Sequence, residues 1–243
     1  MIRFVSSRLT GREQQTRLQL LYVLLGLAFL FAHTLVVTGQ QAPPKHPLTG
    51  RQIANIYTGR DWLDRAEREK EEQPDRALEL IGIKPGMIIA DVGAGSGYMS
   101  VRLARRVGQG GKVYANDLQA TMLKLLQDKV RREKLTNVEL VQGTATDTRL
   151  PAGAIDLALL VDVYHEFWYP QEMLQSIRRS LKPNGQLVLL EYRKEDPNLQ
   201  ILPDHKMSVI EVRTELEAEG FTFDRLIPQL PRQHIIVFRT PAR

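Results

Sequence analysis

The sequence contains no cysteine, so disulfide bonds, thiolate zinc sites and cysteine nucleophiles are all excluded. Any metal ion would have to be held by His, Asp or Glu side chains. The excess of positive charge is also small: the sequence has 33 Lys and Arg against 28 Asp and Glu, and four of the arginines fall within the first 17 residues. No later run of Lys and Arg is interleaved with aromatic residues, so we expect no nucleic-acid partner.

The composition is otherwise that of a globular protein. Of the 243 residues, 43% are hydrophobic and 25% are charged, which excludes a disordered or collagen-like chain. This length allows one large domain or two small ones, and either can bury a core.

One long apolar run lies near the N-terminus, at residues 18–38, and it contains no Asp, Glu, Lys or Arg. As a helix it would be about 31 Å long, which matches a hydrocarbon layer of roughly 30 Å. It follows a basic leader, residues 1–17, and lacks the A-x-A pattern of a cleavage site, so a single-pass membrane anchor is favoured over a signal peptide for export. The charge bias places the N-terminus in the cytoplasm and the rest of the chain across the membrane. Residues 39–60, with three prolines between 41 and 50, are expected to form a linker.

From residue 61 to 243 the pattern predicts one domain in which short apolar strands alternate with amphipathic helices. Runs such as IDLALLV and QLVLLE are apolar at almost every position, which indicates a parallel sheet covered on both faces. The last two strands are joined by a connection too short for a parallel crossover, so the final strand should run antiparallel. We expect an α/β fold with a doubly wound, mostly parallel seven-stranded sheet, preceded by the N-terminal hydrophobic helix. The expected strands are 87–92, 112–117, 138–142, 155–163, 186–192, 221–227 and 234–240, and the expected helices begin near Asp61 and Pro74 and then span 98–107, 119–134, 170–181 and 207–219.

A helical segment at residues 61–81 precedes the first of these strands. Its charged part, RAEREKEE at 65–72, is expected to form a solvated face with salt bridges. The position of the segment in the chain suggests a lid over a ligand bound at the sheet.

The first strand runs into a glycine-rich loop, IIADVGAGSGYMS at residues 88–100. Glycines between a strand and a helix let the backbone approach a nucleotide-like ligand closely. A dinucleotide fingerprint, G-x-G-x-x-G/A, requires a small residue in its last slot, but here that slot holds Tyr98. Asp91 at the end of the strand instead suits a cationic ligand with an amino-acid moiety. The spacing therefore favours such a cofactor over a dinucleotide.

An acidic residue followed by G-x-G-x-G resembles the first motif of the class I S-adenosylmethionine-dependent methyltransferases. The resemblance covers about residues 77–240: KVYANDL ends the second strand with Asp117, and LKPNGQLVLLE at 181–191 matches the family's turn into its fifth strand. It implies S-adenosylmethionine as cofactor, with Asp117 accepting hydrogen bonds from the ribose hydroxyls. It also implies that Met122 packs against adenine and that Asp147 lies towards the adenine amino group.

Local structure offers a second interpretation of some of these residues. Asp117 could cap the helix that follows it, and Asp147 could hydrogen-bond within its own turn. Thr144 stands where many relatives carry an earlier Asp. The cofactor-binding set implied by the resemblance is Asp91, Gly93, Ala94, Gly95, Gly97, Asp117, Leu118, Met122, Asp147 and Asp162.

The fourth strand ends in VDVYHEFWYP, residues 161–170, at the sheet edge where open α/β sheets bind substrates. A methyl acceptor must lose or share its proton before it attacks, so His165 or Glu166 could be the general base. Aromatic rings, including that of Tyr164, could hold a flat substrate or stabilise a cationic sulfur. Positioning without any base is the alternative. We take His165, Glu166 and Tyr164 as the catalytic candidates.

The antiparallel last strand should bring Arg232 and His234 towards His165, and the loop after the fifth strand should bring His205 and Lys206 there. Three histidines could then converge, but no i, i+4 pair or other ligand spacing supports a metal site, and none is expected. Tyr192, Arg193 and Lys206 are candidates for the polar edge of the substrate site, with solvated surface as the alternative.

The resemblance implies S-adenosylmethionine-dependent methyl transfer to a small-molecule acceptor. We expect a domain spanning residues 61–243 that the N-terminal helix attaches to a membrane. The resemblance is to the small-molecule branch, such as the quinone C-methyltransferases, since no asparagine-proline catalytic motif is present. A nucleotide-dependent oxidoreductase and a non-catalytic, membrane-anchored module that binds S-adenosylmethionine are the alternatives.

Overall fold

A computed structural model describes residues 44–59 and 61–241. The expected basic leader, the hydrophobic helix at 18–38 and the first part of the linker lie outside the described residues. Within the described ranges, no helix is both long enough and apolar enough to cross a membrane.

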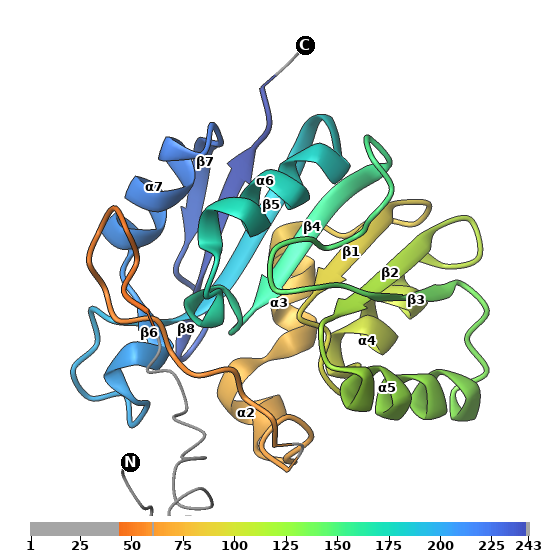
Figure 1. The fold of residues 1–243 in the computed structure, drawn as a ribbon. Coiled ribbons are helices and arrows are strands. Elements are labelled where there is room, and N and C mark those ends of the chain that lie inside the picture. Colours follow the sequence, from red (N-terminus) through yellow and green to blue (C-terminus); the bar gives the residue numbers. More distant parts are fainter. Residues whose placement is uncertain (1–43, 60, 242–243) are drawn as a thin grey trace, which may run out of the picture. The chain divides into compact units, whose positions relative to one another are not determined.

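The core of the domain is a mixed sheet of eight strands (Figure 1). Its order is β3-β2-β1-β4-β5-β8-β7, and β6 pairs with the end of β5. The pairs from β3 to β5 are parallel, whereas β8 is antiparallel to both β5 and β7, which confirms the expected direction of the last strand. The strands are β1 Ile88–Val92, β2 Lys112–Asp117, β3 Val138–Gln142, β4 Ile155–Val161, β5 Leu181–Arg193, β6 Lys206–Met207, β7 Thr222–Ile227 and β8 Gln233–Arg239.

The expected count of seven strands was wrong because of β6. This strand has two residues and pairs in parallel with Tyr192 and Arg193. Two residues are too few to produce a period-two pattern, so no sequence pattern indicated this strand.

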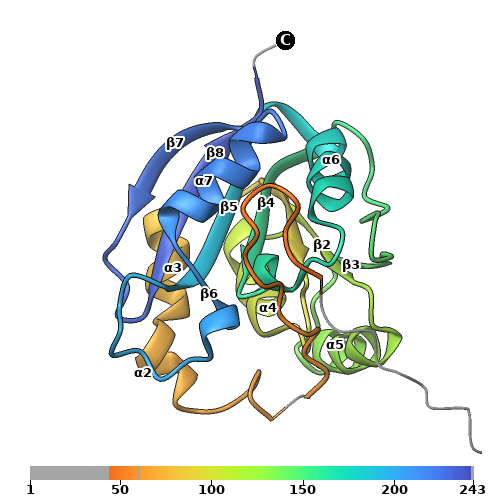
Figure 2. The same cartoon turned by 60° about the vertical axis from the view of Figure 1, so that its left-hand side comes forward.

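The helices cover both faces of the sheet (Figures 1 and 2). One apolar core joins α6 and α7 to alternate strand residues such as Ala90, Ala158 and Leu160. The other joins α3 and α4 to the intervening residues, such as Ile89 and Leu157. Because successive strand side chains point to opposite faces, a strand buried on both faces has to be apolar throughout. The helices are α2 Arg68–Glu72, α3 Pro74–Ile81, α4 Tyr98–Val107, α5 Ala120–Arg132, α6 Pro170–Ser180 and α7 Val209–Ala218, with 3₁₀ turns at Tyr164–Glu166 and Pro203–His205.

The helix expected to begin near Asp61 begins only at Arg68. The residues before it form turns, and two arginines bond back to their carbonyl groups. Arg65 donates to the carbonyl oxygen of Trp62 at 2.8 Å, and Arg68 donates to that of Leu63 at 2.9 Å. These bonds satisfy carbonyl groups that a continuous helix would use internally.

Residues 44–59, which the sequence analysis assigned to the linker, contribute buried side chains to the domain. Ile53 and Ala54 are fully buried, and the backbone N–H of Ala54 donates to the carbonyl oxygen of His165 at 3.0 Å. Arg51 is buried beside Glu215 of α7, with Nε 2.9 Å from a carboxylate oxygen. The segment (orange in Figures 1 and 2) thereby reaches the turn that follows β4.

Candidate functional site

The glycine loop after β1 has a backbone conformation that requires glycine. Gly93, Gly95 and Gly97 all have positive φ, of 74°, 53° and 84°. A Cβ atom on Gly93 would lie 2.4 Å from a methyl group of Val163, and one on Gly97 would lie 2.7 Å from Leu126. The loop therefore turns tightly against the end of β4 and against α5, and it leaves the backbone exposed towards a ligand.

Asp117, at the end of β2, fixes this loop through its carboxylate. One oxygen, Oδ2, accepts a hydrogen bond from the N–H of Gly95 at 2.8 Å, and Oδ1 accepts one from the N–H of Gln119 at 2.8 Å. Burial raises the pKa of Asp117, and the backbone donors partly offset that rise. A carboxylate oxygen has two lone pairs, so each oxygen keeps one acceptor position for the hydroxyl groups of a ligand.

Asp91 lies deeper, at the end of β1. Its side chain is buried and its Oδ2 accepts a hydrogen bond from the hydroxyl of Ser100 on α4 at 2.5 Å. Burial raises the pKa of Asp91 to about 6, while the Ser100 bond and the charge of Arg68 oppose that rise. A small cavity of about 30 Å³ lies between Asp91, Arg68 and the glycine loop.

Two larger cavities meet at the carboxyl end of β4. The first, which we call the loop cavity, has a volume of about 100 Å³ and lies over the glycine loop. The second, which we call the histidine cavity, has a volume of about 310 Å³. The loop cavity is lined by residues that include Gly93, Gly95, Asn116, Asp117, Leu118, Gln119, Met122, Thr144, Phe167 and Met173. The histidine cavity is lined by residues that include Trp62, Arg68, Glu72, His165, Tyr192, Gln200, Ile201, Leu202 and His205. Five residues line both cavities: Tyr57, Leu63, Val161, Asp162 and Glu166.

The segment before α2 covers these cavities. Leu63 lies against the glycine loop, since a Cβ on Gly95 would be 3.0 Å from its methyl group. Tyr57 is attached on two sides: its N–H donates to Glu166 at 3.2 Å, and its carbonyl oxygen accepts from the side chain of Gln119 at 2.8 Å. Both residues line the loop cavity.

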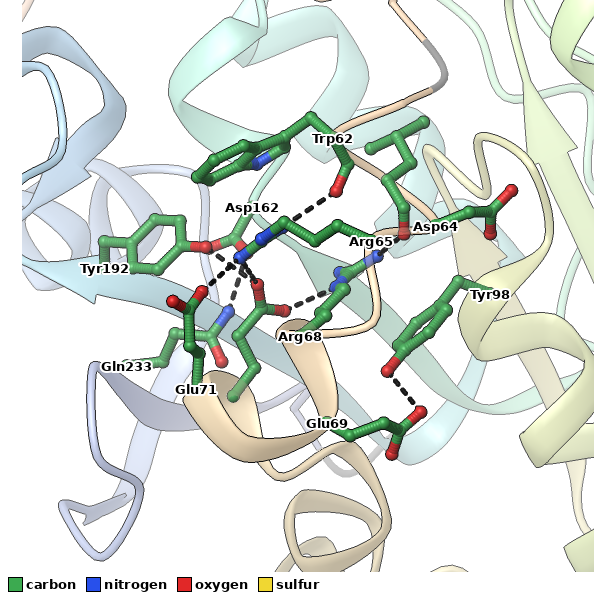
Figure 3. A network of polar contacts seen from close by, with 12 residues as sticks. Trp62, Asp64, Arg65, Arg68, Glu69, Glu71, Tyr98, Asp162, Tyr192 and Gln233 are labelled. Carbon is green, nitrogen blue, oxygen red and sulfur yellow. Dashed lines mark hydrogen bonds and ion pairs between the residues drawn. The ribbon is translucent and has the colours of Figure 1, made fainter.

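A network of charged side chains forms the wall of the histidine cavity on the side of α2 (Figure 3). Glu72 accepts from Arg65 at 2.7 Å, from Arg68 at 2.6 Å and from the Tyr192 hydroxyl at 2.8 Å. Arg68 and Glu72 are buried, although the sequence predicted a solvated face here. Arg68 also lies over the ring of Tyr98, 4.2 Å from its centroid. This network connects α2 to β5 and to the glycine loop.

Asp162 lies at the junction of the two cavities in a strained conformation. Its φ is 49°, and its Oδ2 accepts a hydrogen bond from Gln233 at 2.7 Å. Its Oδ1 is buried and has no hydrogen-bond partner among the described residues. Burial raises the pKa of Asp162 well above its usual range, and the charges of Glu72 and Glu191 add to the rise. A buried polar atom without a partner is costly, so the geometry suits a ligand that donates a hydrogen bond at this point.

His165 lies on the 3₁₀ turn Tyr164–Glu166, three residues after Asp162, and is held by a buried carboxylate. Its Nδ1 lies 2.6 Å from Glu191 on β5, and its Nε2 lies 3.2 Å from Nδ1 of His205. Burial lowers the pKa of His165, but the charge and hydrogen bond of Glu191 outweigh burial, and the net shift is upward. Burial and the charge of His165 lower the pKa of His205. Burial raises the pKa of Glu166 to about 7, against the opposing charge of His165.

Most residues of the expected cofactor set lie at this edge of the sheet. Gly93, Gly95, Asp117, Leu118, Met122 and Asp162 line the loop cavity, and Asp91 and Ala94 line the small cavity beside it. Gly97 lines neither and instead lets α5 pack closely. Asp147 also lies outside both: its Oδ1 accepts from the N–H of Arg149 and the hydroxyl of Ser176, each at 2.8 Å. Thr144 lines the loop cavity in its place.

Of the three catalytic candidates, two line a cavity and one does not. His165 and Glu166 line the histidine cavity, whereas Tyr164 is fully buried in the core and donates its hydroxyl hydrogen to Glu215 at 2.8 Å. Of the residues considered for a polar edge, Tyr192 lines the histidine cavity. Arg193 and Lys206 donate to backbone carbonyl groups, as in the bonds from Arg193 to Leu230 and from Lys206 to Leu199, both at 2.8 Å.

Sequence reasoning missed several residues of the site. Arg68 and Glu72 stand in a run that is charged at almost every position, so their burial had no local signal. Glu191 follows the apolar run LVLL within β5, and a charge directly after such a run was the available clue. His234 pairs with Glu191 in the β5-β8 register, as the topology suggested, but Arg232 bonds to Glu71 at 2.8 Å.

Comparisons with known proteins agree with this geometry. Residues 90–189 match the family described as a methyltransferase domain. The chain is 32% identical over 119 residues to the ubiquinone/menaquinone biosynthesis C-methyltransferase UbiE of Hydrogenovibrio crunogenus, which covers 49% of this chain and 47% of that protein. It is 28% identical over 160 residues to UbiE of Vibrio vulnificus, covering 65% of this chain and 62% of that one.

The chain thus spans about half to three fifths of the length of these relatives. A solved structure described as a SAM-dependent methyltransferase from Aquifex aeolicus has a TM-score of 0.70 and 29% identity, and the match covers 74% of this chain and 95% of that one. The strand order, the glycine loop with Asp91 and Asp117, and these matches lead to one assignment. Residues 90–189 thus match a methyltransferase domain, and the chain is similar to the class I S-adenosylmethionine-dependent methyltransferases, with the quinone C-methyltransferases among its relatives.

Proposed function

We propose that the protein binds S-adenosylmethionine in the loop cavity and the adjoining small cavity, and transfers its methyl group to a small aromatic acceptor in the histidine cavity. The observation that carries this proposal is the shared wall of the two cavities at Asp162 and Glu166. A cofactor in one cavity and an acceptor in the other would meet at this wall. When bound, S-adenosylmethionine supplies an electrophilic methyl group on a positively charged sulfur.

The residues around the loop cavity fit this cofactor. Asp117 has acceptor positions left for ribose hydroxyls, and Met122 and Leu118 supply apolar contacts for adenine. Asp91 offers a carboxylate to the ammonium group, and Arg68 beside the small cavity suits the carboxylate of the amino-acid part. The unpartnered Oδ1 of Asp162 can accept a hydrogen bond from a ligand. The acidic residues would also stabilise the positive charge near the sulfur.

The walls of the histidine cavity fit a flat acceptor that carries hydroxyl groups. Trp62, Tyr57 and Ile201 provide aromatic and apolar surface, and His165 and Glu166 provide hydrogen-bond acceptors at one side. The curated relatives are named for ubiquinone and menaquinone biosynthesis, which supports a quinol-like ring as the acceptor. His165 and Glu166 would orient the acceptor hydroxyl, and one of them would take up its proton. Tyr164 has no place in this proposal, because its hydroxyl is bound to Glu215.

We propose, as a separate point, that residues 18–38 attach the domain to a membrane. The support is the absence of charged residues over a length that matches the hydrocarbon layer. The arginine bias puts the domain across the membrane from the N-terminus. Protease treatment of intact and permeabilised cells tests this orientation: a domain cleaved only after permeabilisation would contradict it.

The cofactor is tested by calorimetric titration of the full-length chain with S-adenosylmethionine and, separately, with NADH. We expect binding of S-adenosylmethionine alone. Binding of NADH alone would favour the oxidoreductase alternative. Transfer is tested with tritiated methyl donor and a short-chain prenylated 1,4-naphthoquinol. Label in that acceptor supports the full proposal, whereas binding without label would count against the quinol and leave the non-catalytic binding module as the better interpretation.

A further inference from the structure

Three side chains of types that bind metals, from two segments far apart in the sequence, converge on one wall of the histidine cavity. His165 and Glu166 stand on the 3₁₀ turn after β4, and His205 ends the 3₁₀ turn before β6. His165 Nε2 lies 3.2 Å from His205 Nδ1 and 3.9 Å from Glu166 Oε1. One possible ligand atom from each residue lies within 4.8 Å of the other two.

Glu191 prepares His165 for such a role. Its Oε2 lies 2.6 Å from His165 Nδ1, and both side chains are buried. A carboxylate at this distance keeps a proton on Nδ1 and leaves the lone pair on Nε2, the atom that faces His205. Histidines that bind metals very often have this carboxylate partner, which sets the orientation of the ring and increases its basicity.

We propose that His165, Glu166 and His205 bind one divalent transition-metal ion, best matched by zinc, with an open coordination position towards the histidine cavity. Bonds of about 2.0–2.2 Å in a tetrahedral arrangement place ligand atoms roughly 3.3–3.6 Å apart. The separations of 3.2 and 3.9 Å from His165 Nε2 lie on either side of that range. Two histidines and one carboxylate, with a fourth position left open, also form a ligand set used by catalytic zinc sites.

A hydrogen bond between the two histidines is the simpler interpretation of the 3.2 Å contact. It gives Glu166 Oε1 no role, because 3.9 Å from His165 Nε2 is too long for a hydrogen bond. The other oxygen of Glu166 already accepts from the N–H of Tyr57. A metal ion would use all three groups.

The consequence for the acceptor rests on the proposed function. With the metal bound, His165 and Glu166 would be ligands and no longer bases, so an acceptor hydroxyl at the open position would be acidified by the metal and would release its proton to water. The ring carbon next to that oxygen would then form a bond to the methyl carbon, while the bond from methyl to sulfur breaks and leaves its electron pair on sulfur. Loss of the hydrogen from that ring carbon as a proton restores the aromatic ring. No oxidant or reductant is needed.

The site is tested with the full-length chain, without a histidine tag, after treatment with a chelator. Cobalt(II) is the probe because it replaces zinc and absorbs visible light when four- or five-coordinate. We expect one equivalent of cobalt per chain, displaced by zinc. His205→Gln should weaken binding at least tenfold, since this half-buried side chain is the ligand whose replacement disturbs the core least. Glu191→Gln should weaken it by about tenfold or more through His165.

His46→Gln is the matched control, since His46 is buried on the segment before α2 and lies outside the cluster. Its cobalt affinity should equal that of the unmodified chain. Absence of stoichiometric cobalt binding, or equal binding by His205→Gln, would overturn the proposal and leave a histidine hydrogen bond only. Circular dichroism of each variant separates lost binding from lost folding, and Glu166→Gln provides a second ligand variant if His205→Gln does not fold.

The open position is tested by adding acetohydroxamate, an oxygen-donor ligand, to the cobalt-loaded chain. A change in the visible spectrum supports an accessible position, and an unchanged spectrum contradicts it. Titration of the metal-free chain with S-adenosylmethionine separates the two proposals. Cofactor binding without any cobalt binding would reject the metal site and leave the proposed function intact, and the reverse result would reject the function and keep the site.

Discussion

Asp117 accepts a hydrogen bond from the backbone N–H of Gly95 at 2.8 Å, which joins the end of β2 to the glycine loop after β1. Both residues line the loop cavity. The carboxylate therefore has two functions in the proposed site, because it fixes the loop and still has acceptor positions for the ligand.

Asp117→Ala should weaken binding of S-adenosylmethionine by about 1–3 kcal/mol, because the ribose hydroxyls would lose a charged acceptor. Isothermal titration calorimetry measures the change. Asp147→Ala is the matched control: the same substitution, at a residue that the sequence also assigned to the cofactor, lies outside the cavity and should leave the affinity unchanged. Equal effects of the two substitutions would contradict this placement of the cofactor.

Gly93→Ala should destabilise the domain and reduce cofactor binding. The new Cβ would meet Val163 at 2.4 Å, and φ at this position is 74°, a conformation that costs alanine about 1 kcal/mol or more. With the steric clash, we expect a loss of about 2–4 kcal/mol in the free energy of unfolding, measured by urea denaturation.

Two further variants identify the cause of that loss. Gly110→Ala, at a glycine with no close neighbour for a Cβ, should change stability by less than about 0.5 kcal/mol. Adding Val163→Ala to Gly93→Ala should recover part of the loss, since it removes the methyl groups that clash. If the double variant were no more stable than Gly93→Ala, backbone strain alone would be responsible.

The pKa of Asp91 predicts a stability difference that depends on pH. Burial raises this pKa from its ordinary 3.8 to about 6. Between these values the unfolded chain loses its proton first, so rising pH disfavours the folded state, and the full penalty is present above about pH 6. Asp91→Asn removes it. The variant should match the unmodified protein near pH 4 and be more stable by roughly 2–3 kcal/mol at pH 7.5.

Urea denaturation at both pH values measures this difference. Asp128→Asn is the control, since Asp128 is exposed and the neighbouring Lys124 lowers its pKa, so no gain at pH 7.5 is expected. Asp91→Asn should also bind S-adenosylmethionine more weakly, because the carboxylate for the ammonium group is lost. A variant that gained stability and kept its affinity would remove Asp91 from the cofactor site.

The sequence predicted the parts of the fold and site that depend on local pattern. The apolar strands, the glycine loop and Asp117 follow from burial on two faces, from positive φ and from the meeting of parallel strand ends at one edge. The same topology anticipated that His205 would lie near His165. These predictions depended on the order of elements along the chain, and the sheet shows that order.

The remainder depends on contacts that have no local pattern. Thr144 and Asp147 are three residues apart in one irregular loop, and only the loop geometry decides which of them faces the cavity. Arg68 is buried because Glu72 and Tyr98 lie beside it in the fold, although its neighbours in sequence indicate a solvated helix face. The cluster of His165, Glu166 and His205 likewise unites residues 40 positions apart in the sequence, so no short spacing motif could predict it.

Tyr164 provides the last prediction, because the sequence placed it among the catalytic candidates and the structure places it in the core. Its hydroxyl donates to Glu215, which also binds Arg51, so it helps to satisfy a buried carboxylate. Tyr164→Phe should lower the free energy of unfolding by about 1–3 kcal/mol while leaving the affinity for S-adenosylmethionine unchanged. Tyr169→Phe, at a ring 48% exposed, should change neither. A loss of methyl transfer in Tyr164→Phe with unchanged stability would show that this hydroxyl acts in the reaction and that the buried contact with Glu215 is not its main role.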